Sequence, residues 1–502
     1  MLRVLVLLAA ALSARAGTIQ GVVLEQLSGR PLARAVVRLD PVPRSGATPQ
    51  PMLLRSGRSG QFVFPSVAPG IYLLTAIHDG YFPAGFGQRL PTGRGKPIEV
   101  TADSTLFAEL HIHHKGAITG RVFDENGVGT ADVPVLAYKA RLPLLSVGSA
   151  LSDDRGVYRI HGLEPGKYWI RSGAFTFDDG SGWLPTFGLA GHETHEARVH
   201  SVTVDADTTD ADVDPEPGAL FHLGGRITCD TPGAVLLTLS SETGRRRMES
   251  GCPGRYRFEG LAPGAYEIFA TTPDGAAAGY TELFLGQDSD SGNVTLLQIP
   301  TVEIEIRQAG SQSSADLPVT LIGRRQDMSE TEAEHEIQRP RAKLAPGHWE
   351  FRAQVPHGQY VESITVAPGS FRRPLTPERS SDWFPGFIEP RALSRITVLV
   401  SSRSGQVAGR VTADSKPAAG APVFLWPLAE QARRSLGGAV QTLSAADGSY
   451  YFDSLPPGDY RILASFDIYE IDEDLLAMSP AQLIHLDASQ TTNADLTAWI
   501  VP

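Results

Sequence analysis

Histidine and glutamate occur at one spacing in this sequence that could hold a metal ion. His161 and Glu164 have the H-x-x-E spacing of a zinc site, in which a histidine nitrogen and a carboxylate oxygen bind the ion. A zinc hydrolase also needs a third ligand and a general base. The pair overlaps the Pro-Gly turn motif, and around the same positions the other copies carry Ser66 or Gly260, and Ala68, Ala262, Ala345 or Pro456, so we interpret the spacing as a coincidence. We expect no metal, no cofactor and no enzymatic activity.

Two other segments are rich in histidine. Residues 192–196 (HETHE) lack the H-E-x-x-H spacing that places two histidines on one face of a helix. His111, His113 and His114 fall on a predicted strand, where the first two share a face and the third points to the opposite face. A polar loop and a solvated strand end are the interpretations that we favour.

Three aspartates form a weak candidate for a calcium site. Asp124, Asp153 and Asp154 carry the carboxylate oxygens that Ca²⁺ prefers as ligands. Two carboxylates in contact repel each other unless they are protonated or bridged by a cation. The alternative, which we favour, is that these side chains point into water, where surface charges interact weakly.

Aromatic residues recur around a proline in three loops. These candidate ligand-binding residues are Tyr81, Phe82, Trp183, Phe187, Trp383 and Phe387. Aromatic rings on a proline-stiffened loop are suited to stack on sugar rings or to anchor a protein partner at low entropic cost. The alternative is that the rings cap their own domain or pack between domains, because large aromatic residues are buried on average. Solvent exposure of the rings distinguishes the two interpretations.

A six-residue pattern, written five times, organises the chain around these residues. Its copies are residues 67–72 (VAPGIY), 163–168 (LEPGKY), 261–266 (LAPGAY), 344–349 (LAPGHW) and 455–460 (LPPGDY). Proline followed by glycine favours a type II turn between two strands, and the flanking Leu or Val and Tyr or Trp should point into one core. The copies are spaced by about a hundred residues, which is the size of a domain.

Short runs of alternating apolar and polar residues between these turns predict strands with one buried face. About seven such runs in about a hundred residues are typical of an immunoglobulin-like sandwich. The predicted fold is therefore all-β, a tandem array of about five β-sandwich modules, which we expect to be extended. The predicted bounds are a signal peptide at 1–16 and modules at 17–113, 114–217 with an acidic linker, 218–303, 304–402 (divergent) and 403–502.

The order of motifs within a module resembles a known family. Gly-Arg-Val, then Ala-x-Val, then Asp-x-x-Gly-x-Tyr, then Leu-x-Pro-Gly-x-Tyr is similar to the carboxypeptidase regulatory-like domain. That domain is a transthyretin-like sandwich found in tandem in exported bacterial proteins, notably of acidobacterial type. The resemblance covers most of the chain and is loosest in the fourth module. It implies a fold grouped with carbohydrate-binding-like folds, and it implies neither peptidase activity nor catalytic residues.

The sequence contains two cysteines, Cys229 and Cys252, both in the third module. The positions that match them in the first, second and fifth modules are Glu25 and Arg58, Asp124 and Asp154, and Ala413 and Ala446. Cysteine with cysteine, acid with base and alanine with alanine are choices that facing side chains would make. We infer that the two positions are neighbours and that the cysteines form a disulfide, which an oxidising compartment allows.

Composition and the first residues bear on location and partners. Arg3, an apolar run from Val4 to Leu12 and the A-x-A segment 14–16 are typical of a secretory signal peptide. No later apolar run is long enough to span a membrane. A formal net charge of −12 without a basic stripe argues against nucleic acid as a partner.

These observations predict an exported, non-catalytic binding or spacer protein. It would act in the periplasm or outside the cell, and its partner would be a polysaccharide or another envelope protein. One alternative is a metal-dependent hydrolase in the divergent fourth module and its neighbours. The other is a purely structural stalk, which predicts that the aromatic loops are buried between modules.

Overall fold

The fold is known from a computed structural model, which describes residues 16–42, 50–141, 144, 146–189, 191–192, 194–311, 316–328, 331–367, 382–391 and 393–502. The predicted signal peptide, apart from residue 16, lies outside these residues. Strands dominate the described chain, with two short helices, α1 (Glu430–Leu436) and α2 (Glu473–Met478). Within the described ranges, neither helix has the length and apolar character needed to cross a bilayer.

Five two-layered β-sandwiches follow one another along the chain, which confirms the predicted fold class. In the first layer of each, the opening strand lies between an antiparallel and a parallel neighbour. In the first three sandwiches these layers are β4 (Gln61–Val67), β1 (Gly17–Glu25) and β8 (Thr105–Ile112); β12 (Val157–Leu163), β9 (Gly116–Arg121) and β17 (Asp207–Thr208); and β21 (Gly254–Leu261), β18 (Phe221–Thr228) and β24 (Val294–Thr295). The fourth consists of β29 (Arg341–Lys343), β26 (Thr301–Gln308), β33 (Arg395–Ser401) and β31 (Tyr360–Ala367), which pairs with β33. In the fifth, β34 (Gly405–Ala413) pairs with β38 (Ser449–Leu455), β41 (Thr491–Asn493), β42 (Leu496–Thr497) and β35 (Lys416–Pro417).

The second layer of each sandwich is antiparallel and carries the strand that follows the Pro-Gly corner. Their members are β3 (Met52–Arg55), β2 (Val36–Pro41), β5 (Gly70–Ile77), β6 (Ala84–Gly85) and β7 (Ile98–Val100); β11 (Ser146–Leu151), β10 (Pro134–Lys139), β13 (Gly166–Ser172) and β16 (His200–Val202); β20 (Gly244–Cys252), β19 (Gly233–Ser241), β22 (Gly264–Thr271), β23 (Ala277–Leu285) and β25 (Leu297–Gln298); β28 (His335–Ile337), β27 (Thr320–Gln326), β30 (Gly347–Gln354) and β32 (Phe384–Ile388); and β37 (Val440–Leu443), β36 (Pro422–Pro427), β39 (Gly458–Ala464) and β40 (Gln482–Leu486). A separate pair, β14 (Phe175–Thr176) and β15 (Gly182–Trp183), completes the set. Each two-layered unit encloses its own apolar core.

The Pro-Gly corners bury their flanking side chains, as predicted: Leu163 and Tyr168, for example, are almost fully buried. Each closing aromatic donates a hydrogen bond to the carbonyl oxygen four residues earlier. The bonds are Tyr72 to Ala68 (2.8 Å), Tyr168 to Glu164 (2.7 Å), Tyr266 to Ala262 (2.8 Å), Trp349 to Ala345 (2.8 Å) and Tyr460 to Pro456 (2.6 Å). The expected type II geometry is wrong, since Gly166 has φ 150° where that turn needs about 80°. The glycine already begins the next strand, and the aromatic side chain closes the corner instead.

The Gly-Arg-Val and Gly-x-Tyr motifs meet in space. A Cβ atom on Gly120 would lie 2.1 Å from the carbonyl oxygen of Ala211, on the segment beside the opening strand. The Tyr158 hydroxyl donates a hydrogen bond to that same carbonyl. In the fifth sandwich, Gly409 and Tyr450 share the carbonyl of Ala494 in the same way. The small residue therefore admits the neighbouring segment, and the tyrosine fixes it.

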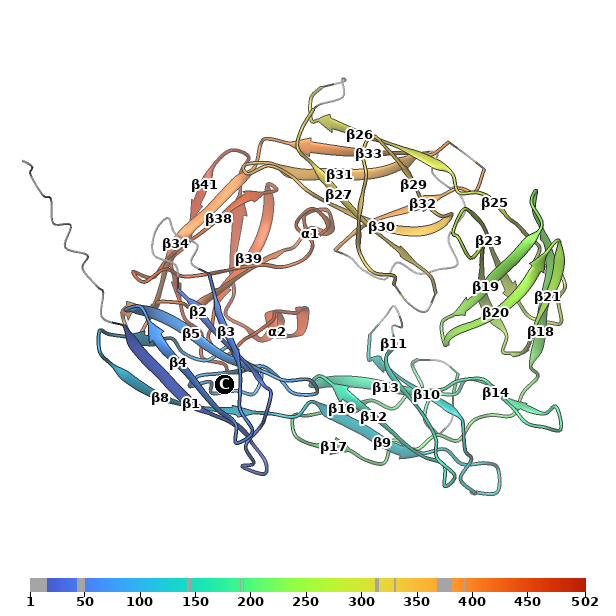
Figure 1. Ribbon diagram of the computed structural model, residues 1–502, viewed down its shortest axis with the longest axis horizontal. Helices are drawn as coiled ribbons and strands as arrows, with labels where there is room; N and C mark the ends of the chain where they lie inside the picture. Colours follow the sequence, from blue (N-terminus) through green and yellow to red (C-terminus); the bar gives the residue numbers. More distant parts are fainter. Residues whose placement is uncertain are drawn as a thin grey trace, which may run out of the picture.

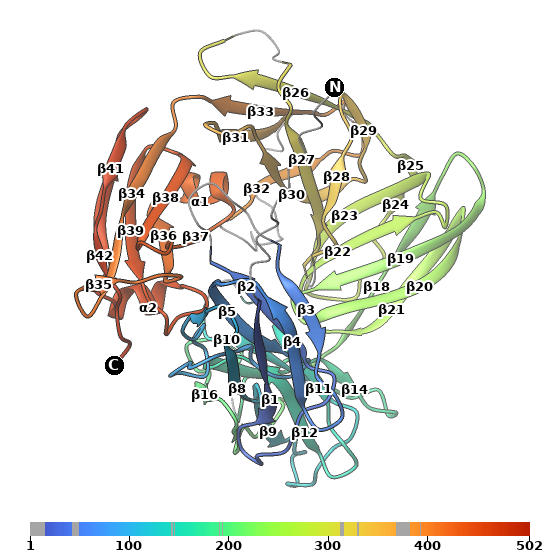
Figure 2. The same cartoon turned by 60° about the vertical axis from the view of Figure 1, so that its left-hand side comes forward.

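The five sandwiches close into a ring, so the expectation of an extended array is wrong. Figure 1 shows the second layers facing the middle of the ring and the first layers facing outward, and Figure 2 shows the same closure after a turn. The first and fifth sandwiches meet through an ion pair between Arg89 and Asp467 (2.7 Å) and a bond from the Arg94 N–H to the Phe466 carbonyl (3.0 Å). Contacts between residues so distant along the chain cannot be read from a repeat.

Candidate functional site: the junctions between sandwiches

The metal-binding candidates do not come together. His161 is exposed on β12, and the nearest cation to the Glu164 carboxylate is Lys139, at 3.9 Å. His192 pairs with Glu216 at 2.6 Å, while Glu193 lies outside the described residues. In the part of the chain that the structure describes, no three His, Cys, Asp or Glu side chains gather around a possible metal position.

The three aspartates of the calcium candidate also have separate contacts. Asp124 accepts hydrogen bonds from the backbone N–H groups of its own turn, including that of Val128 (2.7 Å). Asp153 binds Arg155 at 2.8 Å, whereas Asp154 extends into solvent. The carboxylates of Asp124 and Asp153 therefore stabilise two tight turns.

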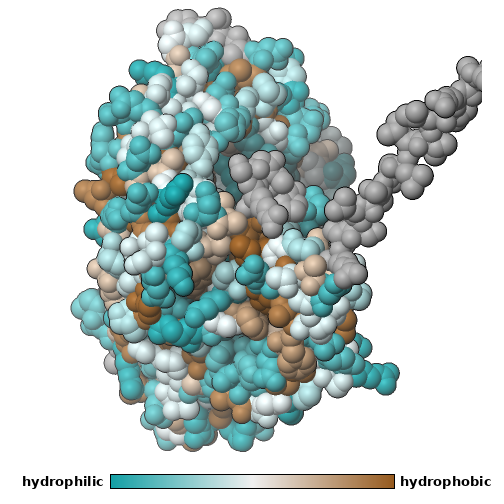
Figure 3. Space-filling view, turned by 90° about the vertical axis from the view of Figure 1, so that its left-hand side faces the viewer, coloured by the Kyte–Doolittle hydropathy of each residue, from teal (hydrophilic) through white to brown (hydrophobic). Residues whose placement is uncertain are grey.

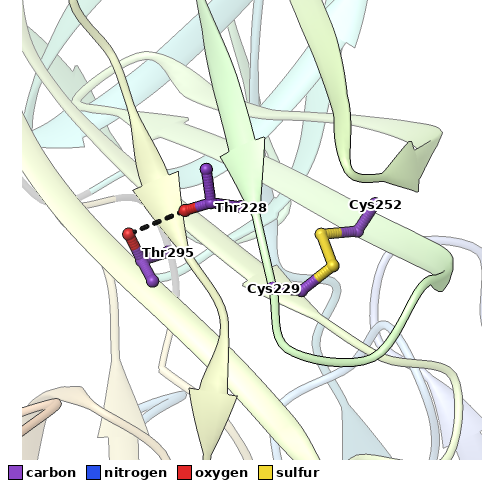
Figure 4. Close-up of a disulfide and its surroundings, with 4 residues drawn as sticks. All are labelled: Thr228, Cys229, Cys252 and Thr295. Carbon is purple, nitrogen blue, oxygen red and sulfur yellow. Dashed lines mark hydrogen bonds between the residues drawn. A yellow bond between two sulfur atoms is a disulfide. The ribbon is translucent and has the colours of Figure 1, made fainter.

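The predicted disulfide between Cys229 and Cys252 is present, with Cα atoms 6.1 Å apart. Figure 4 shows it beside the end of β18, where Thr228 bonds Thr295 at 2.9 Å. It ties the loop after the opening strand to the end of β20 and so joins the two layers of the third sandwich.

In the first sandwich the Glu25 carboxylate pairs with Arg30 (3.3 Å), and Arg58 is exposed; that the positions of Glu25 and Arg58 are neighbours stays a prediction. The chain turns back immediately after β1, and the Glu25 N–H bonds the Arg30 carbonyl at 2.9 Å. A local turn therefore brings a nearer arginine to the carboxylate.

The aromatic loops fold inward. Trp183 and Trp383 are each 5% exposed, and Phe82 and Phe187 are also buried. Trp183 packs edge-on against Phe177 at 4.7 Å between ring centroids. Trp383 lies beneath two guanidinium groups, those of Arg324 at 4.1 Å and Arg352 at 4.7 Å. Stacking on a sugar needs an open ring face, so ligand binding by these loops stays a prediction that their exposure does not support.

Tyr81 from the first of these loops builds the junction between the first and second sandwiches. Its ring lies 4.0 Å from the ring of His114, and its hydroxyl donates to Glu25 at 3.2 Å. His114 also binds Glu25, and the adjacent His113 binds Asp205. The three histidines of the segment 111–114 therefore have three different carboxylate partners, since His111 pairs with Glu109 at 3.6 Å.

Glu25 is the electrostatic centre of this junction. Its side chain is largely buried and accepts hydrogen bonds from Ser28, His114, Arg30 and Tyr81. Donors that point at a carboxylate stabilise its charged form. The bonds from Ser28 and His114 are the largest causes, and together with the others they lower the pKa of Glu25 to about 2 despite its burial.

Phe187 from the second loop lies at the next junction. Its ring packs against Tyr138, and the guanidinium of Arg171 lies 4.9 Å above it. Arg171 reaches the third sandwich through an ion pair with Glu242 at 3.1 Å. Tyr138 donates to the Glu242 carbonyl at 3.4 Å, and burial raises the pKa of its hydroxyl. An aromatic side chain thus supports a charged contact between two sandwiches.

Phe387 from the third loop lies between the third and fourth sandwiches. Its ring contacts Tyr280 (5.5 Å) and His348 (4.9 Å), and His348 pairs with Glu282 at 2.6 Å. A pocket of about 460 Å³ opens beside Tyr280 and is lined mainly by the segments 293–297 and 389–391.

The same junction buries a second carboxyl group. Glu267 on β22 is fully buried, and neither of its oxygens has a hydrogen-bond partner among the residues that the structure describes. The nearest cation is the Arg325 guanidinium at 3.7 Å, which also stacks over Phe269 and bonds Glu332 at 3.1 Å. Burial is the main cause that raises the pKa of Glu267 to about 8, so the group is mostly neutral at pH 7.

The junction between the fourth and fifth sandwiches uses polar contacts. The fourth and fifth sandwiches meet where the Gly358 N–H bonds Ser454 (2.9 Å), Ser404 bonds the Gly358 carbonyl (2.7 Å) and His357 pairs with Asp453. Each junction around the ring therefore contains specific hydrogen bonds, ion pairs or ring contacts. Sequence analysis missed Glu267, whose only signal was a charged residue between apolar neighbours on a predicted strand.

Comparison with known proteins does not assign the chain to a family. No protein-family model matches the chain, and no curated protein matches it either. Similar solved structures include the minor pilin GBS52 of Streptococcus agalactiae (13% identity, 41% of this chain, 97% of the pilin, TM-score 0.25). Others are the major pilin BcpA of Bacillus cereus (11%, 76% and 99%, 0.15) and two B repeats of the Staphylococcus aureus collagen-binding protein (12%, 77% and 100%, 0.13). At these TM-scores the chains do not superpose as wholes, and we draw nothing from the likeness.

Proposed function

We propose that the chain is an exported, non-catalytic binding or spacer protein of the cell envelope, and that it works as a rigid ring-shaped scaffold. The observation that supports this is the closure of the ring. Asp467 of the fifth sandwich pairs with Arg89 and accepts the N–H of Val501 at 3.1 Å, so one buried carboxylate holds both the first sandwich and the end of the fifth. Linked domains move relative to one another unless their interfaces are extensive, and here each sandwich has two neighbours.

The partner would be a polysaccharide or another envelope protein. One aromatic residue of each loop packs at a junction, namely Tyr81, Phe187 and Phe387. Trp183 and Trp383 instead pack within their own sandwiches, so the stalk alternative, which expected them between modules, is supported only in part. The hydrolase alternative requires His161 and Glu164 to meet a second histidine, and the separate contacts of His161 and Glu164 do not favour it.

Small-angle X-ray scattering of the mature chain tests the scaffold. The wild type should give the short maximum dimension of a closed ring. Arg89→Glu should lengthen it, because a carboxylate would then face Asp467. Arg341→Glu is the matched control, since Arg341 is exposed and its ion pair is with Glu303 (3.4 Å) of the same sandwich. A wild type that already scatters as a string of five domains would contradict the proposal.

A further inference from the structure

The outward layer of the first sandwich differs from the other four in charge. Its strands β4, β1 and β8 contain neither arginine nor lysine, whereas each of the other outward layers contains at least one. Those of the second, third and fourth sandwiches carry ion pairs across or along their strands: Arg159 with Asp207, Arg257 with Glu259, and Arg395 with Glu303. Charged pairs of this kind keep a sheet face solvated and unattractive to partners.

The outward layer of the first sandwich instead displays an aromatic ring in a row of uncharged residues that runs across its three strands. Phe107 on β8 is 62% exposed and Val63 on β4 is 46% exposed. Both are in register with Gln20 on the central strand β1. The Gln20 amide and the Thr105 hydroxyl make no hydrogen bond within the described chain. Figure 3 views the ring from this side, and apolar side chains lie among hydrophilic ones in its lower half.

A flat face with this composition suits one class of partner. An exposed aromatic ring offers a planar apolar surface to the C–H face of a sugar, and the free amide and hydroxyl beside it match the hydroxyl groups of the same sugar. Phe107 and Val63 lie on either side of Gln20, so the ring, the amide and the second apolar side chain form one row across the three strands. Only Glu109 and His111 on this face carry titratable groups, and they pair with each other at 3.6 Å.

We propose, building on the binding role above, that the outward face of β4, β1 and β8 binds a neutral polysaccharide, with Phe107 as the stacking platform and Gln20 and Thr105 as hydrogen-bonding residues. The net charge of the chain favours a neutral glycan over a second copy of the chain or an anionic polymer. The chain has a formal net charge of −12, so a second copy or an anionic polymer would meet a like charge. A neutral sugar chain meets no such repulsion, and its binding should be insensitive to salt.

Affinity electrophoresis of the full mature chain tests this site. Native gels would contain hydroxyethylcellulose, laminarin, galactomannan or arabinoxylan as neutral probes, and polygalacturonate as an anionic probe. We expect at least one neutral probe to retard the wild type, and Phe107→Ala to raise the apparent Kd at least tenfold. Phe107→Tyr should retain binding. Phe284→Ala is the matched control, because Phe284 is 69% exposed on β23 of the third sandwich.

Three outcomes would overturn the assignment: no retardation in any neutral gel, equal retardation of Phe107→Ala and wild type, or retardation by polygalacturonate alone. A concentration-dependent dimer in sedimentation velocity that Phe107→Ala abolishes would also overturn it, by showing that the face joins two copies. Scattering from the same samples reports ring closure independently, so failure of glycan binding is distinguishable from failure of the scaffold.

Discussion

Glu25 and Glu267 are both buried glutamates at junctions between sandwiches, yet their pKa values shift in opposite directions. Glu25, between the first and second sandwiches, has a pKa of about 2 because Ser28, His114 and other donors point at its carboxylate. Glu267, between the third and fourth, has a pKa of about 8 because it is buried without a hydrogen bond to either oxygen. Burial by itself therefore does not decide the charge of a junction; the number of donors that reach the carboxyl group does.

The two junctions should consequently respond to pH in opposite ways. The first is stabilised by a charged carboxylate and weakens in acid. The second is stabilised by a neutral carboxyl group and weakens in base, when Glu267 must ionise beside Asp327 and Glu282, whose charges also raise its pKa.

Glu267→Gln should have the largest effect. The folded-state pKa of about 8 lies above the unfolded value, so the wild type loses stability as pH rises from about 4.5 to about 8. Glutamine imitates the neutral acid and does not ionise. We expect the variant to be more stable than wild type by roughly 3 kcal/mol at pH 9 and equal to it at pH 4, measured by urea unfolding.

Glu259→Gln is the matched control for this variant, because Glu259 lies on β21, in the outward layer of the same sandwich, with its side chain in solvent. Its stability difference from wild type should stay within about 0.5 kcal/mol at both pH values. A destabilised Glu267→Gln at pH 9 would mean that the ionised pair with Arg325 holds the junction, and the comparison between the two glutamates would fail.

Glu25→Gln should have a smaller effect of the opposite sign. The amide nitrogen replaces an acceptor at which several donors point, and hydrogen bonds to charged groups contribute about 1.5–3 kcal/mol each. We expect a loss of about 2 kcal/mol at pH 7. The folded-state pKa lies below the unfolded value, so the wild-type advantage is present above about pH 4.5 and is lost as pH falls through about 2.

Urea unfolding at pH 7 and pH 2.5 measures this difference, with Glu109→Gln as the control, since Glu109 is exposed on β8 and pairs with His111 at 3.6 Å. A stability loss from Glu25→Gln that is the same at both pH values would show that packing, and not charge, is what Glu25 contributes.

Much of the fold could be predicted because it depends on local chemistry. Tyr168 lies two residues after Gly166 and bonds the carbonyl oxygen four residues back, so each copy of the pattern reports one sandwich. Cys229 and Cys252 were matched by their places in the repeat, and their disulfide forms. The ring was not predictable, because Arg89 and Asp467 meet only after four intervening junctions have each set an angle.

The candidate site was harder to predict for a related reason. Trp183 and Trp383 have the residue type of a binding platform, but exposure depends on which neighbours cover them, and Phe177 and Arg324 do so. Phe107 carried no motif and is displayed on the outward layer. Repeat alignment predicted Arg58 as a neighbour of Glu25 but not its ion pair with Arg30, which a local turn brings to the carboxylate.

Tyr81→Phe should have the smallest effect and tests whether Glu25 works through its donors. The change removes the hydroxyl that donates to Glu25 at 3.2 Å but keeps the ring beside His114. We expect a loss of about 1 kcal/mol at pH 7. In a double-mutant cycle the loss should shrink when Glu25→Gln is present, because the charged acceptor is then gone. Tyr451→Phe, at an exposed tyrosine of the fifth sandwich, should cost almost nothing. If Tyr81→Phe costs the same with Glu25 and with glutamine at that position, the low pKa of Glu25 does not arise from this hydroxyl, and the contrast with Glu267 rests on Ser28, Arg30 and His114 alone.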